Sequence, residues 1–589
     1  MKKKQSYISI IARNTSEYFS KSGFWGYLEQ MIAILRAVLC GVEILAIKRL
    51  FDAVTYQRNF HKIAMALLLF TLVIVSQQLL SGLGQYLLSK VSYTNMGKFM
   101  VDFQRKLGRL PAIYFEDSMF LDKVEKAKEC LEYESLGHFA SICLQMITYY
   151  FVYLMAVGGY LFQASPLLIG VIFLAFIPSF LAQIVKAKYF IDLEETLAPE
   201  RRRCNAYKNS IIHVRSFKET RILGAYHYFY QLFTESLHRM TNKRWQTEKK
   251  LAYIQIGLNG ITFMGLGLSI YILFTQVMLG RISVGMFAAV FVSLSDVFGV
   301  MDELVSSHIG RGSEILAQVA NFYSLMDLEE TIDFPTSLDF SKGIVAKEVS
   351  FIYPRAEKNA LSHVSLEVEP RETLAIVGEN GSGKSTLVKI LTGLYASDTG
   401  SVHIGGEKVK QHSLGRKYPQ ISGVFQNFQR YKLALEENIY ISDLEQKEDL
   451  ARMDVVLKEA QFEHPTATKD TLLSPEFGGI DLSGGQWQRL SIARGLFRKS
   501  EFMVLDEPTA SIDPIEESKL YQQFQKIVKD RCALIVTHRL ASAKFADRIV
   551  VMDHGNIIEI GTHDELMKQN GKYHAMWEAQ AQWYQRDDS

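Results

Sequence analysis

Long stretches without charged residues dominate the first half of the chain and limit its fold more than any other feature. The run from Ile63 to Ser89 contains no Asp, Glu, Lys or Arg, and neither does the run from Phe139 to Val185. A helix that crosses a bilayer needs about 20 apolar residues, so the second run is long enough for two crossings. Gly158 and Pro166 lie near its middle, where the chain can reverse. The first half is therefore predicted to be a membrane domain.

Six membrane-spanning helices are predicted. Glu29, Arg36 and Glu43 interrupt the first, but its other positions are apolar and it gives an even number of crossings. The predicted spans cover residues 24–50, 61–89, 139–161, 165–187, 251–279 and 283–305. The predicted division of the chain is a membrane domain at 1–324, a linker at 325–340, a second domain at 341–582 and a tail at 583–589.

Basic residues flank the predicted spans unevenly. Residues 90–137 contain eight Lys or Arg and residues 186–250 contain fourteen, whereas the loops on the other side hold almost none. Because basic loops remain on the cytoplasmic side, both long segments, both termini and the second domain are predicted to be cytoplasmic. No apolar stretch follows the N-terminal Met-Lys-Lys-Lys before Phe24, so a signal peptide is not predicted.

The overall charge and the cysteines exclude several classes of protein. The chain has 589 residues, with 65 Lys and Arg against 63 Asp and Glu, and this balance argues against a nucleic-acid partner. Its five cysteines are scattered without a C-x-x-C pair, so neither a zinc site nor a disulfide framework is expected to organise the fold. A chain of this length is expected to form two or more domains.

The two basic segments are rich in helix-forming residues, so the spanning helices are expected to continue well past the bilayer. Short helices at the tips of these segments are candidates for coupling to the second domain. One tip is residues 113–118, with the aromatic pair Tyr114 and Phe115, and the other is residues 214–219, with Phe217. A plain cytoplasmic insertion with solvated turns is the alternative.

The second half contains a phosphate-binding loop. Residues 378–386 match G-x-x-x-x-G-K-[ST], between a predicted strand at 373–377 and a predicted helix at 386–391. The glycines let backbone N–H groups surround a phosphate at the helix N-terminus. Lys384 is expected to contact the β and γ oxygens, and Ser385 is expected to bind Mg²⁺. The nucleotide-binding residues of this loop are Gly378, Glu379, Asn380, Gly381, Ser382, Gly383, Lys384, Ser385 and Thr386.

A second motif lies on a strand-like run further along the chain. Residues 502–507 read Phe-Met-Val-Leu-Asp-Glu, an apolar run that ends in two carboxylates. Asp506 is the candidate to support the metal. Glu507 points to the opposite face of the strand, and it is the candidate to orient or deprotonate an attacking water. Together the two motifs predict hydrolysis of ATP with Mg²⁺.

Further motifs give the chain a resemblance to ATP-binding-cassette (ABC) proteins. Residues 482–486 read Leu-Ser-Gly-Gly-Gln, which is identical to the signature sequence of that family. Tyr353 resembles the adenine-stacking residue, Gln426 the residue of the loop between the cassette's lobes, Asp513 the D-loop aspartate and His538 the switch histidine. The resemblance covers the full chain. It implies a type IV ABC exporter fold, an all-α six-helix membrane domain followed by an α/β phosphate-loop NTPase cassette.

The resemblance also implies roles for these residues. Glu507 and His538 would act in hydrolysis, and Ser385, Gln426 and Asp506 would hold the metal. The signature loop of one cassette would close over the nucleotide on the phosphate loop of another, so a dimer is implied. Every motif is intact, which favours two copies of this chain over a pair with a related chain. The signature residues carried over as nucleotide contacts are Ser483, Gly484, Gly485 and Gln486.

A shorter resemblance concerns the transported substrate. Residues 114–116, 120–127, 216–219 and 483–488 resemble exporters of lantibiotics and other peptides from Gram-positive bacteria. ATP-driven peptide export across a bacterial cytoplasmic membrane is therefore the expected function. The alternatives are a multidrug or lipid exporter or flippase, and a siderophore-type importer. A soluble cassette ATPase and a nucleotide-gated channel are disfavoured, the first by the six spans and the second by the intact Glu507.

Charged residues within the spans mark a candidate substrate cavity. Glu29, Arg36 and Glu43 recur every seven residues and therefore share one helical face. Charged residues inside a membrane face the bundle interior or a wet cavity. Together with Asp296 they are candidates to line a cavity for a polar or cationic substrate. Pairing within the helix bundle is the alternative.

Overall fold

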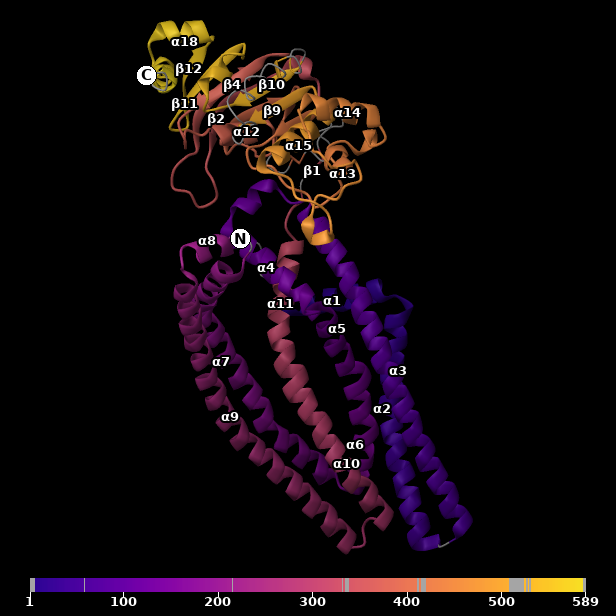
Figure 1. Ribbon diagram of the computed structural model, residues 1–589. Coiled ribbons are helices and arrows are strands. Elements are labelled where there is room, and N and C mark those ends of the chain that lie inside the picture. The colour runs from indigo at the N-terminus through magenta and orange to yellow at the C-terminus, as the bar shows by residue number, and fades with distance from the viewer. Residues whose placement is uncertain are drawn as a thin grey trace. The chain divides into compact units, whose positions relative to one another are not determined.

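The computed structural model of the chain separates into two units (Figure 1). It describes residues 6–57, 59–213, 216–330, 332–333, 338–409, 413–414, 420–507, 524–525, 528 and 531–585. The first unit contains Met1–Arg105 and Lys123–Asp327, and the second contains Lys106–Asp122 and Leu328–Ser589. Residues 106–122 run from the end of the helix Phe60–Leu107 to the start of the helix Ser118–Glu132, and they group with the C-terminal unit.

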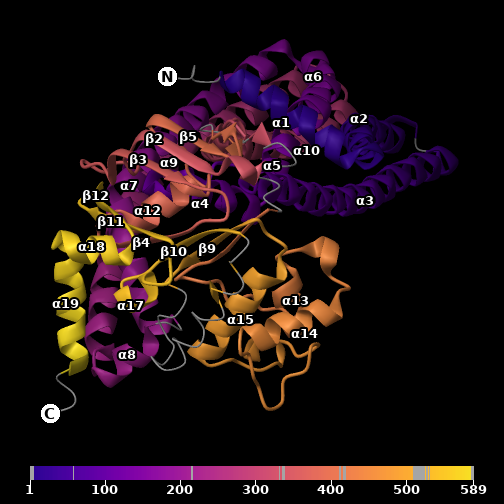
Figure 2. The ribbon, with the colours of Figure 1, turned by 90° about the horizontal axis from the view of Figure 1, so that it is seen from above.

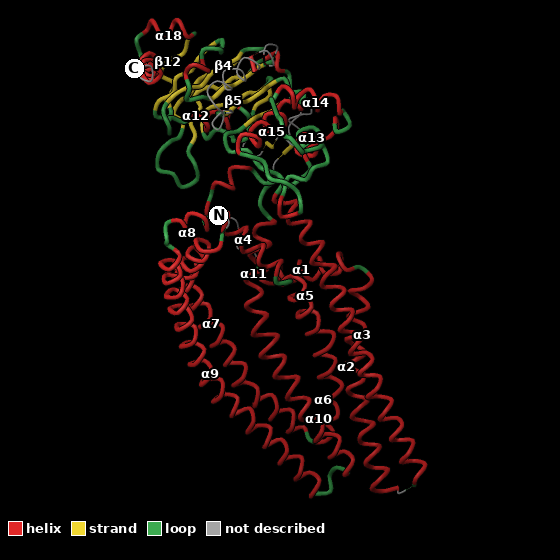
Figure 3. Tube along the Cα trace, in the orientation of Figure 1, coloured by secondary structure: helices red, strands yellow, loops and turns green. Residues whose placement is uncertain are grey.

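Helices make up the first unit, and the strands lie in the second (Figure 3). Six helices in the described part of the chain are long and apolar enough to cross a membrane, as the sequence predicted. These helices span Phe24–Tyr56, Phe60–Leu107, Ser135–Ala164, Pro166–Lys186, Tyr226–Met278 and Val284–Met326. The chain is therefore a multi-pass membrane protein.

The helices of the first unit differ in length from the predicted spans. In chain order they are α1 (Tyr7–Ser22), α2 (Phe24–Asp52), η1 (Ala53–Gln57), α3 (Phe60–Leu107), α4 (Ser118–Glu132), α5 (Ser135–Gln145), η3 (Met146–Phe151), α6 (Val152–Ala164), α7 (Pro166–Ile212), α8 (Phe217–Ile222), α9 (Tyr226–Met278), α10 (Val284–Asp302), η4 (Glu303–Gly310) and α11 (Arg311–Met326). The third span begins four residues before its predicted start at 139, and α10, η4 and α11 carry the sixth well past 305. Three segments, η1, η3 and η4, are π-helical.

The reversal between α6 and α7 takes a single residue. Ser165 is extended, with φ of −168° and ψ of 124°, and Pro166 begins α7. Proline suits this position because the first helical N–H has no partner within the helix. The apolar core of the unit lies where α2, α6, α7, α9 and α10 meet, around the fully buried Ala37, Leu168, Leu273 and Val290.

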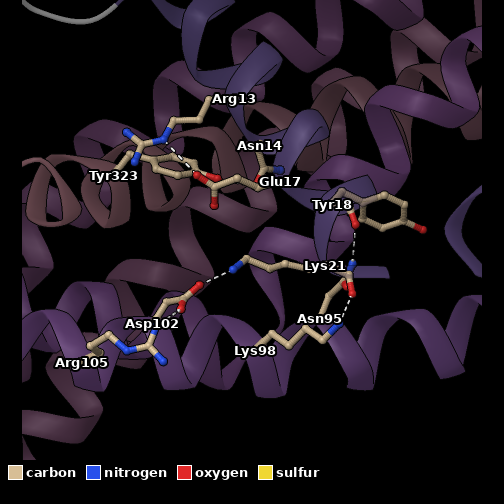
Figure 4. A network of polar contacts seen from close by, with 10 residues as sticks. All are labelled: Arg13, Asn14, Glu17, Tyr18, Lys21, Asn95, Lys98, Asp102, Arg105 and Tyr323. Carbon is tan, nitrogen blue, oxygen red and sulfur yellow. Dashed lines mark hydrogen bonds and ion pairs between the residues drawn. The ribbon is translucent and has the colours of Figure 1, made fainter. Parts of the chain in front are cut away.

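The sequence did not predict helix α1, which precedes the first span. Its buried Asn14 donates from Nδ2 to Leu136 O at 3.0 Å and accepts from Tyr323 OH at 3.1 Å. The Arg13 guanidinium lies 4.3 Å above the ring of Tyr323 on α11, and Lys21 forms an ion pair with Asp102 on α3. Figure 4 shows Arg13 beside Tyr323 and the pair of Lys21 with Asp102, contacts through which α1 holds α3 and α11 together.

Among its described residues, the second unit contains two larger sheets and one small two-stranded sheet. The mostly parallel sheet has the order β12-β11-β4-β10-β9-β8, and the antiparallel sheet has the order β3-β2-β5-β6. The strands are β2 (Ile344–Phe351), β3 (Leu361–Val368), β4 (Thr373–Gly378), β5 (Thr399–Ile404), β6 (Glu407–Lys408), β8 (Ile421–Val424), β9 (Phe502–Asp506), β10 (Cys532–Val536), β11 (Arg548–Asp553) and β12 (Asn556–Gly561), with a small pair of β1 (Ile332–Asp333) and β7 (Ser413–Leu414).

Helices surround the parallel sheet on different sides (Figure 2). α13, α14 and α15 gather in one lobe, and α18 and α19 lie toward the opposite edge near β11 and β12. The helices of this unit are η2 (Ala112–Glu116), η5 (Phe340–Lys342), α12 (Lys384–Leu391), α13 (Leu435–Tyr440), η6 (Leu444–Gln446), α14 (Leu450–Glu459), η7 (Pro475–Phe477), α15 (Gly484–Phe497), α17 (Leu540–Ala543), α18 (His563–Gln569) and α19 (Lys572–Gln585). The predicted tail at 583–589 therefore begins inside α19, and residues 586–589 lie outside the described part.

Candidate functional site

The phosphate loop joins a buried strand to a helix N-terminus. β4 is buried along its whole length between β10 and β11, and it leads through the loop into α12. Gly378 has a φ of 150°, and a Cβ there would lie 2.4 Å from Met552 O. Gly383 has a φ of 103°, and a Cβ there would lie 2.8 Å from Ala360 O. Only glycine fits both positions, so the sequence fixes the shape of the loop.

A cavity of about 570 Å³ lies beside this loop. Gly381 leaves open space where a Cβ would stand, and the buried Ser382 Oγ makes no hydrogen bond within the described part of the chain. A buried hydroxyl without a partner beside a helix N-terminus suits an anionic ligand rich in oxygen. The cavity is lined by Tyr353, Lys358, Asn359, Ala360, Asn380, Gly381, Gly383, Lys384, Ser385, Thr386, Gln426, Glu507, His554 and Gly555.

Lys384 lies over the loop from which it comes. Its Nζ donates to Gly378 O and to Glu379 O, at 2.9 Å each. Burial lowers the pKa of Lys384, while the charges of Glu507 and Asp506 act in the opposite direction. Burial also raises the pKa of Asp506 to about 6, and the neighbouring Glu507 adds to this rise. The site therefore holds one cation and two carboxylates in a poorly solvated place, where charges interact strongly.

Three residues predicted from separate motifs meet at Glu507. Gln426 Nε2 donates to Glu507 Oε2 at 2.5 Å, and His538 Nδ1 lies 3.2 Å from Glu507 Oε1. Glu507 has a φ of 47°, and its side chain is only 12% exposed. Strained backbone at a non-glycine residue is common at functional sites. Parallel strands explain the meeting, because β8, β9 and β10 are neighbours and their carboxyl ends lead to Gln426, Glu507 and His538.

Tyr353 lines one wall of the cavity. Its hydroxyl lies 3.2 Å from Thr386 Oγ1, and Lys389 Nζ donates to it at 3.4 Å. Its ring stands edge-on to Phe351 at 5.1 Å between centroids. The wall also includes Lys358, Asn359 and His554, which the sequence did not single out because no motif marks them.

The signature residues cap a helix. Ser483 Oγ accepts from Gln486 N at 3.2 Å, and Gln486 Oε1 accepts from Ser483 N at 3.0 Å, which is a capping box at the start of α15. Gly484 and Gly485 follow the cap and expose the backbone N–H groups of the first turn. All four signature residues are described, and none of them lines the cavity of its own phosphate loop. Asp513 lies outside the described residues.

The predicted metal ligands are Ser385, Gln426 and Asp506. Ser385 and Gln426 line the cavity, and Asp506 ends β9 next to Glu507. Among the described residues, no group of three or more His, Cys, Asp or Glu could hold a metal ion. A hydroxyl, an amide and one carboxylate are hard oxygen donors that suit Mg²⁺ together with phosphate oxygens. The residues therefore fit a metal that arrives with a nucleotide.

The first predicted coupling tip, η2, belongs to the same unit as the cassette. The rings of Tyr114 and Phe115 lie 5.5 and 5.2 Å from the ring of Phe120, so the aromatic pair packs mainly within its own segment. Acidic neighbours make the polar contacts with the cassette. Glu116 Oε1 accepts from Tyr395 OH at 2.5 Å and from Lys389 Nζ at 3.2 Å, and Asp117 pairs with Arg355 at 3.0 Å.

Burial at η2 explains why the segment groups with the cassette. Ala112 and Ile113 pack against the core of the antiparallel sheet. The hydrogen bond from Tyr395 lowers the pKa of Glu116, and Lys389 lowers it further, while partial burial opposes both. The sequence placed Glu116 inside the predicted tip 113–118 but singled out its aromatic residues and gave Glu116 no role of its own. The second tip is α8, where Phe217 is half-buried at the first position; Val214 and Arg215 lie outside the described residues.

The charged residues of the spans line two adjoining cavities in the first unit. Glu29 and Arg36 border one of about 260 Å³, and Glu43 and Asp296 border another of about 350 Å³. Tyr149 and Glu303, from the π-helical segments η3 and η4, line both.

Some of these charged residues also have partners within the unit. Glu29 accepts from Tyr18 OH at 3.1 Å, and Glu43 accepts from Gln77 Nε2 at 2.9 Å. The Arg36 guanidinium lies 5.6 Å from the centre of the Tyr149 ring. The helical face identified from the sequence thus combines cavity lining with pairing inside the bundle.

Residues 361–510 match the family model described as ABC transporter. The chain is 30% identical over 523 residues to the subtilin transport ATP-binding protein SpaT of Bacillus subtilis, covering 84% of this chain and 83% of that protein. It is 29% identical over 381 residues to the nisin transport ATP-binding protein NisT of Lactococcus lactis subsp. lactis, covering 62% and 63%.

Two further likenesses concern lipid transport and fold. The chain is 28% identical over 549 residues to the ATP-dependent lipid A-core flippase of Pseudomonas syringae pv. tomato, covering 90% of this chain and 88% of that protein. The structure of a bacterial Atm1-family ABC exporter with ATP bound superposes with a TM-score of 0.78 at 21% identity, covering 94% of this chain and 98% of that one. The structural likeness establishes the fold.

Proposed function

Because the chain belongs to the ATP-binding-cassette transporter family, we propose that two copies of it form an ATP-driven exporter that carries a peptide across a bacterial cytoplasmic membrane. The observation that carries the proposal is the meeting of Gln426, Glu507 and His538 beside the cavity of the phosphate loop. The peptide substrate is supported by the likeness to the subtilin and nisin transport proteins.

Each cassette would bind ATP through residues of the same cavity. Backbone N–H groups at the start of α12 and the Lys384 ammonium would bind the phosphates, and the ring of Tyr353 would stack on adenine. Ser385, Gln426 and Asp506 would hold Mg²⁺, which neutralises negative charge on the phosphates when it is bound.

Hydrolysis would depend on Glu507 and His538. The Glu507 carboxylate is fixed between Gln426 and His538, so it would orient an attacking water and accept its proton. The His538 side chain, half-exposed beside that carboxylate, would contact the terminal phosphate. Low exposure of Glu507 keeps bulk water from competing for its lone pairs.

The signature residues support assembly of two copies. The capping box pairs the N–H groups of Ser483 and Gln486, and the N–H groups of Gly484 and Gly485 are left at the N-terminus of α15, where they suit an anion. None of these four residues lines the cavity of its own described chain. A second copy would bring its signature loop to this cavity. Since Lys384, Glu507 and His538 are all present, two identical chains would form two competent sites.

Movement of the cassettes would reach the spans through the two tips. In η2, Glu116 and Asp117 carry the polar contacts, and Tyr114 and Phe115 would stiffen the segment by packing on Phe120. In α8, Phe217 would make the corresponding contact. Both termini and both cassettes would lie in the cytoplasm, on the side of the basic segments.

Within the spans, the substrate would enter the two cavities that Glu29, Arg36, Glu43 and Asp296 line. These residues, with Glu303, supply more carboxylates than cations, a charge that favours a peptide with basic residues. Lipid movement is a second candidate, because the match to the lipid A-core flippase covers 90% of this chain.

Complementation tests the composite site. Lys384→Ala removes the phosphate-loop lysine, and Ser483→Arg blocks the signature loop, so each homodimer is expected to lose ATP hydrolysis. A heterodimer of the two variants, purified through two different tags, contains one fully intact site and one doubly altered site. We expect it to regain about half of the parental ATPase activity. Heterodimers as inactive as the two homodimers would contradict the shared site.

Inside-out membrane vesicles test the substrate. We expect ATP-dependent uptake of a labelled cationic lanthionine peptide, and no uptake by vesicles that carry Glu507→Gln. Fluorescent lipid A in reconstituted liposomes is the parallel assay. Lipid movement without peptide uptake would replace the peptide with a lipid as the substrate.

A further inference from the structure

The C-terminal helix α19 carries a polar side chain where its pattern calls for an apolar one. Tyr573, Met576 and Trp577 form the stripe that packs on the core beneath β4, and Tyr573 is fully buried there. Gln580 occupies the next position of the stripe, seven residues after Tyr573. A glutamine at such a position needs polar partners, and these partners point to its role.

Gln580 binds the backbone of the loop that carries His538. Its Nε2 donates to His538 O at 2.5 Å, and its Oε1 accepts from Leu540 N at 2.9 Å. One amide group thus holds the loop on both sides of Arg539. The His538 side chain leaves this anchored backbone and places Nδ1 3.2 Å from Glu507 Oε1. Gln580 is therefore connected to the proposed catalytic carboxylate through a single residue.

The other end of α19 reaches the phosphate loop. Lys572 Nζ lies 3.2 Å from Glu379 Oε1 and 2.8 Å from Asp553 Oδ1. Glu559 fixes this end of the helix by accepting from the backbone N–H groups of Lys572 and Tyr573, at 2.5 and 3.1 Å. The helix is thus tied at one end to the phosphate loop and at the other end to the loop that carries His538.

We propose that Gln580 is a positioning residue for ATP hydrolysis, which sets the orientation of His538 against Glu507 by clamping the backbone on either side of Arg539. The inference depends on the roles proposed above for Glu507 and His538. It adds a residue far from the recognised motifs in sequence, on a helix that does not line the nucleotide cavity. Gln580 touches neither the nucleotide cavity nor Glu507 in the described structure, so its effect passes through His538.

Two substitutions separate positioning from simple capping of α17. Gln580→Leu removes both hydrogen bonds at similar volume. Gln580→Glu keeps an oxygen that can accept from Leu540 N, but it cannot donate to His538 O. In the full-length protein in lipid nanodiscs, we expect both variants to lower kcat for ATP about tenfold, less than the roughly hundredfold that a 1 Å misplacement of a catalytic group can cost. KM for ATP is expected to change less than twofold.

A double-mutant cycle with His538→Ala gives the decisive readout. In the His538→Ala background, Gln580→Leu is expected to lower kcat by less than a further twofold, because the imidazole that Gln580 is proposed to position is already absent. The matched control is Gln569→Leu on α18, an exposed glutamine expected to leave kcat and the melting temperature unchanged. Melting temperatures of the Gln580 variants within a few degrees of the parent exclude unfolding as the cause.

Four results would overturn the proposal. One is an unchanged kcat in Gln580→Glu, which would leave only the capping of α17. Another is an equal loss from Gln580→Leu with and without His538. If His538→Ala itself leaves turnover intact, the proposed role of His538 fails and the inference fails with it. If His538→Ala lowers kcat but Gln580 variants do not, the inference alone fails.

Discussion

Replacing Glu507 with glutamine removes one negative charge and leaves nearly the same shape. The carboxylate now contacts Gln426 Nε2 through Oε2 and His538 Nδ1 through Oε1. The amide of Glu507→Gln has one accepting oxygen, so it keeps only one of these contacts. Losing one such hydrogen bond costs about 1 kcal/mol of folding free energy. In a domain of this size that lowers the melting temperature by about 2–4 °C.

The effect on turnover is expected to be much larger than the effect on stability. Glutamine cannot accept the proton of the attacking water, and loss of a general base slows reactions by roughly 10²–10⁴-fold. That range corresponds to about 2.7–5.4 kcal/mol of transition-state free energy. We therefore expect kcat to fall at least about a hundredfold while the dissociation constant for ATP stays within about threefold, because Lys384 and Tyr353 are untouched.

Phosphate release and binding of labelled ATP, measured on the same purified full-length protein, check this prediction. Glu501→Gln serves as the control, since Glu501 lies just before β9 and pairs with Gln420 on the surface. A Glu507→Gln protein that keeps more than about a tenth of the parental kcat would refute the assignment of the base. A large loss of ATP affinity would instead place Glu507 among the nucleotide-binding groups.

Three further predictions concern the coupling tip and the cavity. Glu116→Gln is expected to lower the melting temperature by about 2–4 °C at pH 7, with Glu125→Gln as the exposed control, because a part-exposed ion pair is worth about 1 kcal/mol. The pKa of Glu116 is lowered in the folded protein. The difference in melting temperature between the parent and Glu116→Gln should therefore shrink as the pH falls through that lowered pKa, because both proteins then lack the charge. A difference that grows toward low pH would contradict the contact. Gly383→Ala is expected to weaken binding of labelled ATP at least about tenfold, because the new Cβ would meet Ala360 O at 2.8 Å, whereas Gly82→Ala on α3 has open space and should bind normally. Tyr353→Ala is expected to raise KM for ATP roughly tenfold with kcat nearly unchanged, and a fall in kcat alone would argue against stacking.

The parts of the site that local geometry dictates could be predicted from the sequence. The phosphate loop needs glycine at 378 and 383 for steric reasons, so the motif specifies its shape. The signature Ser483 and Gln486 form a capping box by their spacing alone. Apolar runs long enough to cross a bilayer specified six helices in the same way.

Features that depend on topology or on packing could not be predicted. The meeting of Gln426, Glu507 and His538 depends on β8, β9 and β10 being neighbours in the sheet. No single sequence motif specifies this strand order. The roles of Glu116 and Gln580 depend on which surfaces come together, since their own segments show only ordinary polar residues. The π-helical segments and α1 were also missed, because they need tertiary contacts such as those of Asn14.

The grouping of residues 106–122 with the cassette has a practical consequence. A cassette produced alone, starting at residue 341, would lack Ala112 and Ile113 and would leave part of its apolar core open to water. It would also leave Lys389, Tyr395 and Arg355 without their acidic partners. Such a fragment is expected to aggregate and to unfold more readily than the full-length protein. A synthetic peptide with the sequence of residues 106–122 is expected to bind the exposed core and raise the solubility of the fragment.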